Sequence, residues 1–174
     1  MKTFILLLTF FWVARSWGQS GTLTLTPYGI GELKIGSTKK DIESILRQKA
    51  MLKPYMDEHA SGFDTAHCNY RNASLELIFF VLSKSDFDNK KDELPLNMIR
   101  TTSPRIKTKE GIGIGTEKTK ILSTYKNNKV IKNDDTSCDI WVTDKEGNSM
   151  VFYITNSKVT SMAVTIDIEE TPGP

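Results

Sequence analysis

The side chains that could carry acid–base or metal chemistry gather in one short stretch. The two histidines, His59 and His67, lie close to Asp57 and Asp64. A metal site or a hydrolase that uses a histidine base would have to draw on this stretch, because the chain has no other histidine. It contains no H-x-x-x-H or H-E-x-x-H spacing, and the chain contains no G-x-S-x-G motif. We therefore predict exposed loop histidines, no metal, no cofactor and no enzymatic activity.

A second stretch with possible chemistry is GIGIGTEKTKILSTYKNN, residues 111–128, where alternate glycines precede a helical pattern. Such a loop could hold a phosphate. A dinucleotide fingerprint requires G-x-G-x-x-G, and a P-loop ends in G-K-[ST], whereas the glycines here are spaced G-x-G-x-G. The earlier stretch LKIGSTKKDIESIL shares the hydrophobe, the glycine, the hydroxyl and the helical pattern. We predict that Gly36 and Gly115 bend the backbone where a helix starts.

The first residues have the layout of a secretory signal peptide. Lys2 gives a basic start, an apolar run follows over residues 4–14, and the small residues Ser16 and Gly18 precede a cut after Gly18. A membrane span needs about 20 apolar residues, which is longer than this run. We predict that residues 1–18 are cleaved, that no transmembrane segment remains, and that the protein is secreted or periplasmic.

Charge gives no sign of a nucleic-acid partner. Removal of residues 1–18 takes away Lys2 and Arg15, which leaves 21 basic residues against 21 acidic ones. A neutral chain has no basic footprint for phosphates. We therefore predict that the protein binds no nucleic acid.

The two cysteines, Cys68 and Cys138, are 70 residues apart. An even number of cysteines in an exported protein is typical of a disulfide. We predict a Cys68–Cys138 bridge, which on the chain-entropy account would stabilise the fold by about 4 kcal/mol.

Hydrophobic periodicity predicts the elements that position these residues. A helix is expected within residues 33–50, capped by Ser37 or Thr38, and a second helix follows Thr116 as its cap. Three strands with tight turns form a β-meander over residues 138–144, 149–155 and 158–168. Further strands are predicted over residues 22–26 and 75–82, with a weaker one in 94–109.

The two helical stretches match at an offset of 79 residues, with Gly36 aligned to Gly115, and each is followed by a cysteine and an apolar strand. This pattern predicts an α+β fold of two tandem repeats, in which short helices pack on an antiparallel sheet. The repeats would cover residues 19–108 and 109–168 within one compact unit, and residues 169–174 would form a disordered tail.

The patterns L-x-I-G-S-T-x-x-D-I-x-x-I-L and G-I-G-I-G-T-x-x-x-x-I-L-S-T-Y, with the later N-S-K-V-T-S-M-A-V segment, resemble the tandem repeats of beta-lactamase-inhibitor-like proteins and of small outer-membrane assembly lipoproteins. The resemblance implies an extracytoplasmic protein that binds another protein. No cysteine lies near the predicted cut, which argues against the lipoprotein branch. The inhibitors carry bridges within each half, whereas this chain offers one between halves, so no inhibitory contact transfers to a residue here.

We therefore expect an exported, non-catalytic binding protein, such as an inhibitor-like module that recognises another protein. A structural or assembly factor of the cell envelope is the alternative, and a hydrolase is a third. In a neutral protein the partner-binding surface should consist of exposed aromatic side chains. Trp141 could instead be a core residue. The candidates are Tyr55, Phe63, Tyr70, Trp141 and Tyr153.

Two short motifs suggest glycosylation. Asn72 begins an N-x-S sequence, which is an acceptor for N-glycosylation in hosts that modify asparagine. Thr65 lies in a D-T-A sequence that resembles an O-glycosylation motif of some periplasmic proteins. The first motif could be a plain turn, and the second is three residues long and could match by accident.

Overall fold

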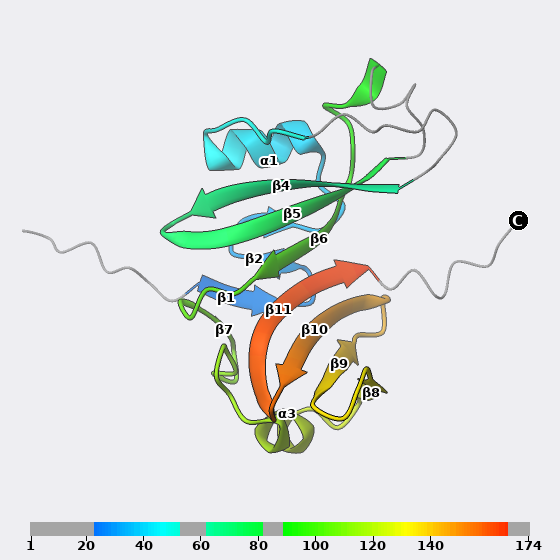
Figure 1. Ribbon diagram of the computed structural model, residues 1–174. Helices are drawn as coiled ribbons and strands as arrows, with labels where there is room; N and C mark the ends of the chain where they lie inside the picture. The colour runs from blue at the N-terminus through cyan, green and yellow to red at the C-terminus, as the bar shows by residue number, and fades with distance from the viewer. Residues whose placement is uncertain (1–22, 53–61, 82–88, 167–174) are drawn as a thin grey trace, which may run out of the picture.

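A computed structural model describes residues 23–52, 62–81 and 89–166, and within them the protein is mostly β (Figure 1). The strands form one sheet of four and one of seven. The predicted signal peptide, the predicted tail, Tyr55, Asp57 and His59 lie outside the described residues. No helix in the described part is long and apolar enough to cross a membrane.

The larger sheet has the order β4-β5-β6-β11-β10-β9-β8, and every neighbouring pair is antiparallel. Two-residue turns close the β4–β5 and β10–β11 hairpins, and their residues have φ of 49° and 64° in both cases, as expected for tight hairpin turns. The strands of this sheet are β4 (Gly62–Tyr70), β5 (Ala73–Val81), β6 (Leu96–Thr101), β8 (Lys129–Lys132), β9 (Ser137–Thr143), β10 (Asn148–Thr155) and β11 (Lys158–Ile166). The predicted β-meander is confirmed as β9, β10 and β11.

The smaller sheet has the order β3-β2-β1-β7. Its strands are β1 (Leu23–Thr26), β2 (Gly29–Ile30), β3 (Leu33–Lys34) and β7 (Ile106–Thr108). The first three form an antiparallel meander, and β7 joins β1 in parallel although the two are far apart in the sequence.

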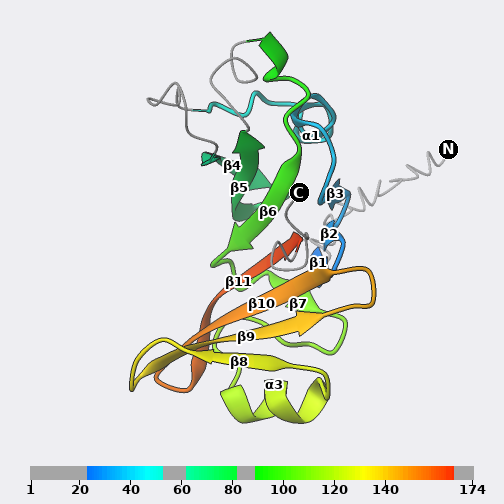
Figure 2. The same cartoon turned by 90° about the vertical axis from the view of Figure 1, so that its right-hand side faces the viewer.

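Two helices have their full extent in the described residues, α1 (Lys39–Leu46) and α3 (Lys118–Thr124), and they lie at opposite ends of the molecule (Figures 1 and 2). Thr38 caps α1, because its side chain accepts a hydrogen bond from Asp41 N. The cap predicted for the second helix is wrong. The N-cap residue of α3 is Glu117, and Thr116 Oγ1 instead accepts from Gly113 N at 3.0 Å.

Both glycines bend the backbone before a helix, as the sequence predicts. Gly36 has φ of +81° and Gly115 has φ of +84°, a conformation that side chains with a Cβ disfavour. Each glycine N–H donates to a strand carbonyl at 2.8 Å, Gly36 to Leu96 and Gly115 to Val159. These glycines therefore attach the start of each helix to the large sheet.

The predicted fold class is wrong, since the protein is mostly β and not two repeats of helices packed on a sheet. The helix α1 is 8 residues long and α3 is 7 residues long. Each helix is therefore too short to bury much surface against a sheet. The stretch that contains His67 forms β4, and the short segment KVIK forms β8. The segment HCNYR at the end of β4 was expected to be strand-like, although its histidine was assigned to a loop, whereas β8 was not predicted.

The core lies on one face of the large sheet and beneath the small one, and its fully buried side chains include Leu77, Phe79, Ile99, Ile140 and Phe152. The helices reach it through Ile42 and Ile121, which have no exposed surface. Phe152 stacks on Tyr125 with ring centroids 5.8 Å apart. The aromatic pair therefore ties the segment after α3 to the centre of β10.

A buried charged cluster lies where α1 meets the segment before β6. Lys39 Nζ lies 2.6 Å from Glu43 Oε1, and the two side chains are only 7% and 8% exposed. Lys49 Nζ lies 2.8 Å from Glu43 Oε2, and Ala50 N donates to Oε1 at 2.9 Å. Asp92 lies 3.5 Å from Lys39 Nζ. Burial favours a raised Glu43 pKa, but the hydrogen bonds from Lys39, Lys49 and Ala50 outweigh it and lower the pKa to about 2.

The predicted Cys68–Cys138 bridge is absent from this structure, in which both cysteines are free. Cys68 lies on β4 and Cys138 on β9, and four strands separate β4 from β9 in the sheet. Strands lie about 4.8 Å apart, whereas the Cα atoms of a disulfide lie within about 7 Å of each other. Burial raises the pKa of Cys68 to about 11, so its thiol is protonated at neutral pH.

Candidate binding pocket

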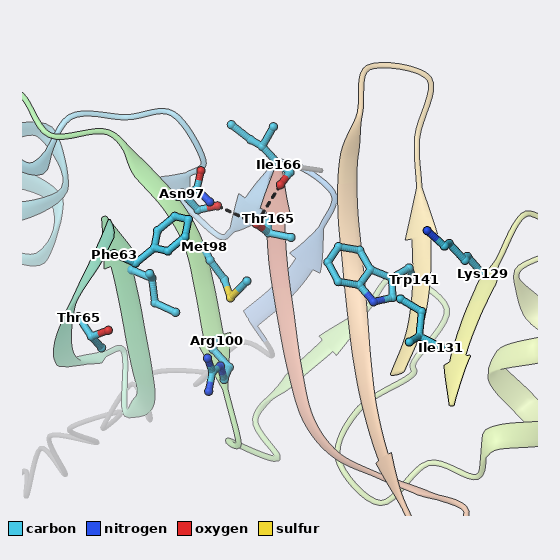
Figure 3. Close-up of a pocket in the computed structure, with 11 residues that line it drawn as sticks. Phe63, Thr65, Asn97, Met98, Arg100, Lys129, Ile131, Trp141, Thr165 and Ile166 are labelled. Carbon is cyan, nitrogen blue, oxygen red and sulfur yellow. Dashed lines mark hydrogen bonds between the residues drawn. The ribbon is translucent and has the colours of Figure 1, made fainter. Parts of the chain in front are cut away.

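A pocket of about 440 Å³ opens on the face of the large sheet opposite the core (Figure 3). It extends across the sheet from β4 at one edge to β8 at the other. Six of its lining side chains are apolar or aromatic, and the remainder are polar or basic. The lining residues are Phe63, Thr65, Ile78, Asn97, Met98, Arg100, Lys129, Ile131, Trp141, Thr165 and Ile166.

Strand alternation places these side chains on this face. On β6, Met98 and Arg100 line the pocket, while Ile99 between them is fully buried in the core. On β9, Trp141 lines the pocket, while Ile140 points into the core. Because successive side chains of a strand point to opposite faces, one sequence builds the core and the pocket together.

One row of paired residues crosses the centre of the face. Arg100 on β6 pairs with Ala163 on β11, which pairs with Val151 on β10. Val151 pairs in turn with Trp141 on β9, which pairs with Lys129 on the edge strand β8. The shorter side chains of Ala163 and Val151, both fully buried, therefore lie between two long side chains that line the pocket.

Two aromatic side chains bound the pocket from opposite sides (Figure 3). Phe63 is 46% exposed, and its ring centroid lies 5.3 Å from that of Phe80. Trp141 is half-buried, and no described residue accepts a hydrogen bond from its buried Nε1. Exposed or half-buried rings of this kind provide large apolar contact area for a ligand.

The charge that lines the pocket is positive. Arg100 Nε lies 3.1 Å from Glu76 Oε2, and the guanidinium lies 5.8 Å from the centre of the Tyr153 ring. Burial raises the pKa of Tyr153, although the charge of Arg100 opposes the shift. Lys129 is the second cation. Among the residues that the structure describes, the lining of the pocket contains no aspartate, glutamate, histidine, serine or cysteine.

Only two of the described aromatic residues that were predicted to bind a partner line the pocket. Phe63 and Trp141 line the pocket, so Trp141 contributes to a surface hollow. Tyr70 is buried in the core at 5% exposure, and Tyr153 packs under Arg100 beside the pocket. His67 lies in a strand and not in a loop, although it is exposed as predicted. Among the described residues, no three His, Cys, Asp or Glu side chains form a group that could hold a metal.

The lining residues that sequence reasoning missed are mainly Ile78, Met98, Arg100, Lys129 and Ile131. A signal existed for β6, where LNMIRT alternates two kinds of side chain. The hollow itself depends on the register of strands that are distant in the sequence, which no local pattern contains.

The two glycosylation candidates differ in their surroundings. Asn72 is exposed in the β4–β5 turn, with φ of 64°, and the following Ala73 is fully buried. Thr65 is partly buried on β4 and lines the pocket. A sugar on Thr65 would therefore occupy space in the pocket, whereas one on Asn72 would extend from the end of a hairpin.

Comparison with known proteins assigns no family. No family model matches this chain, and no curated protein matches it. A solved extracellular protein that contains an SCP domain, from Bacillus anthracis str. Ames, is 9% identical with a TM-score of 0.45; the match covers 76% of this chain and 44% of that one. The uncharacterized protein yfeY from Escherichia coli is 13% identical with a TM-score of 0.39, over 82% of this chain and 99% of that one. The resemblance to beta-lactamase-inhibitor-like proteins stays a prediction.

Proposed function

We propose that this protein is an exported binding protein without catalytic activity, and that it recognises an apolar segment of another protein in the pocket on its large sheet. The observation that supports this proposal is the described lining of the pocket, which combines two aromatic rings with four further apolar side chains and two cations. Binding sites typically have a volume of about 300–1,000 Å³ and are mostly apolar, and this pocket fits both criteria.

The side chains of the pocket are held ready for a partner. Thr165 Oγ1 lies 3.1 Å from Asn97 O and 3.2 Å from Ile166 O, which fixes the end of β11 beside β6 (Figure 3). Trp141 lies on β9, one strand from the edge of the sheet, between its paired neighbours on β8 and β10. Binding of a partner would therefore cost little conformational entropy on this side, because the rings that line the pocket project from paired strands.

Selection of binders from a displayed library of random peptides tests the proposal. We expect selected peptides to share apolar or aromatic residues, and we expect Trp141→Ala to weaken their binding by about thirtyfold or more, as for a central interface aromatic. Affinities are measured by calorimetry on the purified full chain without its signal peptide.

Met51→Ala is the matched control, because Met51 is 79% exposed and lies outside the pocket. This variant should leave every affinity unchanged. Thermal unfolding shows whether each variant is folded. If no peptide is selected, or if the selected peptides bind folded Trp141→Ala as tightly as the parent protein, the proposed function is wrong.

Export rests on the amino-terminal sequence alone. We expect the mature chain to start at Gln19, directly after the predicted cut. The intact mass of protein recovered outside the cytoplasm measures this. A mass that retains residues 1–18 would contradict cleavage.

A further inference from the structure

The strand β8 forms one edge of the large sheet (Figure 2). In the part of the chain that the structure describes, β8 pairs with β9 alone. Its two central residues are exposed hydrophobic residues, Val130 at 43% and Ile131 at 36%. An exposed edge strand offers a row of backbone donors and acceptors to another strand. The sheet therefore ends in an apolar edge that a further strand can extend.

The backbone of β8 alternates in the direction of its hydrogen bonds. Asn133 N donates to Ser137 O at 3.1 Å, where β8 turns into β9. Residues of an antiparallel pair alternate between hydrogen-bonded and non-hydrogen-bonded positions, so the N–H and C=O of Ile131, two residues earlier, also point to β9. The N–H and C=O of Val130 and Lys132 therefore point to the open side of the strand.

The side chains of β8 divide between the two faces of the sheet. Lys129 and Ile131 line the pocket, whereas Val130 and Lys132 line a smaller hollow on the other face. Lys132 Nζ lies 3.0 Å from Asp135 Oδ1. The charge of Lys132 is therefore matched within its own chain, and the edge carries no unmatched positive charge on the face of Val130 from this lysine.

Symmetry limits how two copies of β8 can pair. A two-fold axis that relates antiparallel neighbouring strands is perpendicular to the sheet, so the pocket faces of both copies lie on the same side. Each residue then faces residues of its own face only, and Lys129 cannot face Lys132 of the second copy. With Val130 on the axis, Lys129 faces Ile131 of the second copy and Lys132 faces Asn128 of the second copy. Both lysines then lie opposite uncharged residues, which avoids the cost of like charges directly opposite each other.

We propose that two copies of this protein pair antiparallel through β8, with Val130 on the two-fold axis, and form one continuous sheet across both chains. The outward N–H and C=O of Val130 exchange hydrogen bonds with those of Val130 in the second copy. Ile131 of the second copy lies beside Lys129 at the rim of the pocket, so each copy extends the pocket of the other. This inference does not rest on the proposed function, because the pairing requires only the edge of the sheet.

Sedimentation equilibrium of the full chain without its signal peptide tests the pairing. We expect a dimer that dissociates on dilution, because one short strand from each copy forms a small interface. Val130→Pro removes the outward N–H at the axis and leaves the hydrogen bonds between β8 and β9 in place. It should raise the dissociation constant of the dimer by at least about tenfold. Thermal unfolding shows whether the variant is folded.

A pair of charge variants tests the register. Val130→Lys and Val130→Glu should each be monomeric alone, because like charges would face each other at the axis. An equal mixture of the two should form dimers again, because opposite charges would then face each other. The matched controls are Met51→Lys and Met51→Glu, since Met51 is 79% exposed and lies outside β8. Each control should dimerise alone as tightly as the parent protein.

Amide hydrogen exchange distinguishes the second copy from other occupants of the edge. The amides of Val130 and Lys132 should become protected only as the protein concentration rises, whereas the amide of Ile131 faces β9 and should be protected at every concentration. A monomer with both outward amides protected would assign the edge to another segment of the same chain.

Three results would overturn the proposal: a parent protein that stays monomeric when concentrated, a folded Val130→Pro protein that dimerises as tightly as the parent, or mixed charge variants that stay monomeric. None of them would change the expected effect of Trp141→Ala on peptide binding, so the proposed function is tested separately.

Discussion

Glu43→Gln is expected to lower the free energy of unfolding at pH 7 by about 3 kcal/mol, because breaking a buried ion pair leaves an uncompensated buried charge. Lys39 is 7% exposed and would lose its 2.6 Å contact with a carboxylate. Asp92, at 3.5 Å, would still offset part of its charge, which places the effect at the lower end of the usual range. Urea unfolding of both proteins at pH 7 gives the measurement.

The stability of the protein should depend on pH through the carboxylate of Glu43. The pKa of Glu43 falls from 4.5 to about 2 in the folded state, which corresponds to about 3 kcal/mol. Since the folded pKa is the lower one, this stabilisation is complete above about pH 4.5 and is lost as the pH falls toward 2. The stabilities of the parent and Glu43→Gln should therefore converge across that window.

Lys49→Gln serves as the control, because Lys49 contacts the other oxygen of Glu43 but is 78% exposed. An exposed ion pair contributes at most about 1 kcal/mol, so this variant should change stability little. A Glu43→Gln protein within about 1 kcal/mol of the parent at pH 7, or a difference that persists to pH 2, would contradict the role given to the buried cluster.

Phe152→Ala is expected to cost about 4 kcal/mol of stability, since it removes a fully buried aromatic side chain and leaves a cavity. Phe152 lies on β10 between Ile140 on β9 and Met162 on β11, and it stacks on Tyr125. The loss should therefore loosen both the sheet and the segment after α3. Thermal and urea unfolding measure the change in stability.

Ile166→Ala is the comparison for this cavity, because Ile166 is 39% exposed on β11. It should lower stability by less than about 1 kcal/mol while it widens the pocket. Equal losses for the two variants would show that Phe152 is not a centre of the core.

Sequence patterns identified the elements whose signals are local. The strands β9, β10 and β11 alternate regularly and are joined by turns, so their positions were predicted to within about two residues. The cap of α1 was predicted as Ser37 or Thr38, and the structure has Thr38, whose partner Asp41 lies three residues away. The length of the helices was not predicted, because the helical periodicity of the sequence continues beyond the end of α1. The helix ends at Arg47, which has a left-handed backbone conformation.

Features that depend on distant pairing were missed. No local pattern indicates that β7 joins β1 in parallel, and that contact adds a distant fourth strand to the small sheet. The pocket also has no local pattern in the sequence, since Phe63 and Trp141 were candidates by residue type alone. Their joint position with Met98 and Arg100 arises from strand register across the whole sheet.

The pairing of β6 with β11 also determines how quickly the chain can fold. Each hairpin closes through a short turn, and hairpins of this kind form in about 1–10 μs. The contacts between β6 and β11 join residues far apart, as in the hydrogen bond from Ser161 Oγ to Thr101 O, which spans 60 residues. The entropy of closing such a long loop is lost before the contacts between the two strands can stabilise the chain. Refolding speed should therefore depend on substitutions at this β6–β11 boundary far more than on substitutions in the two turns.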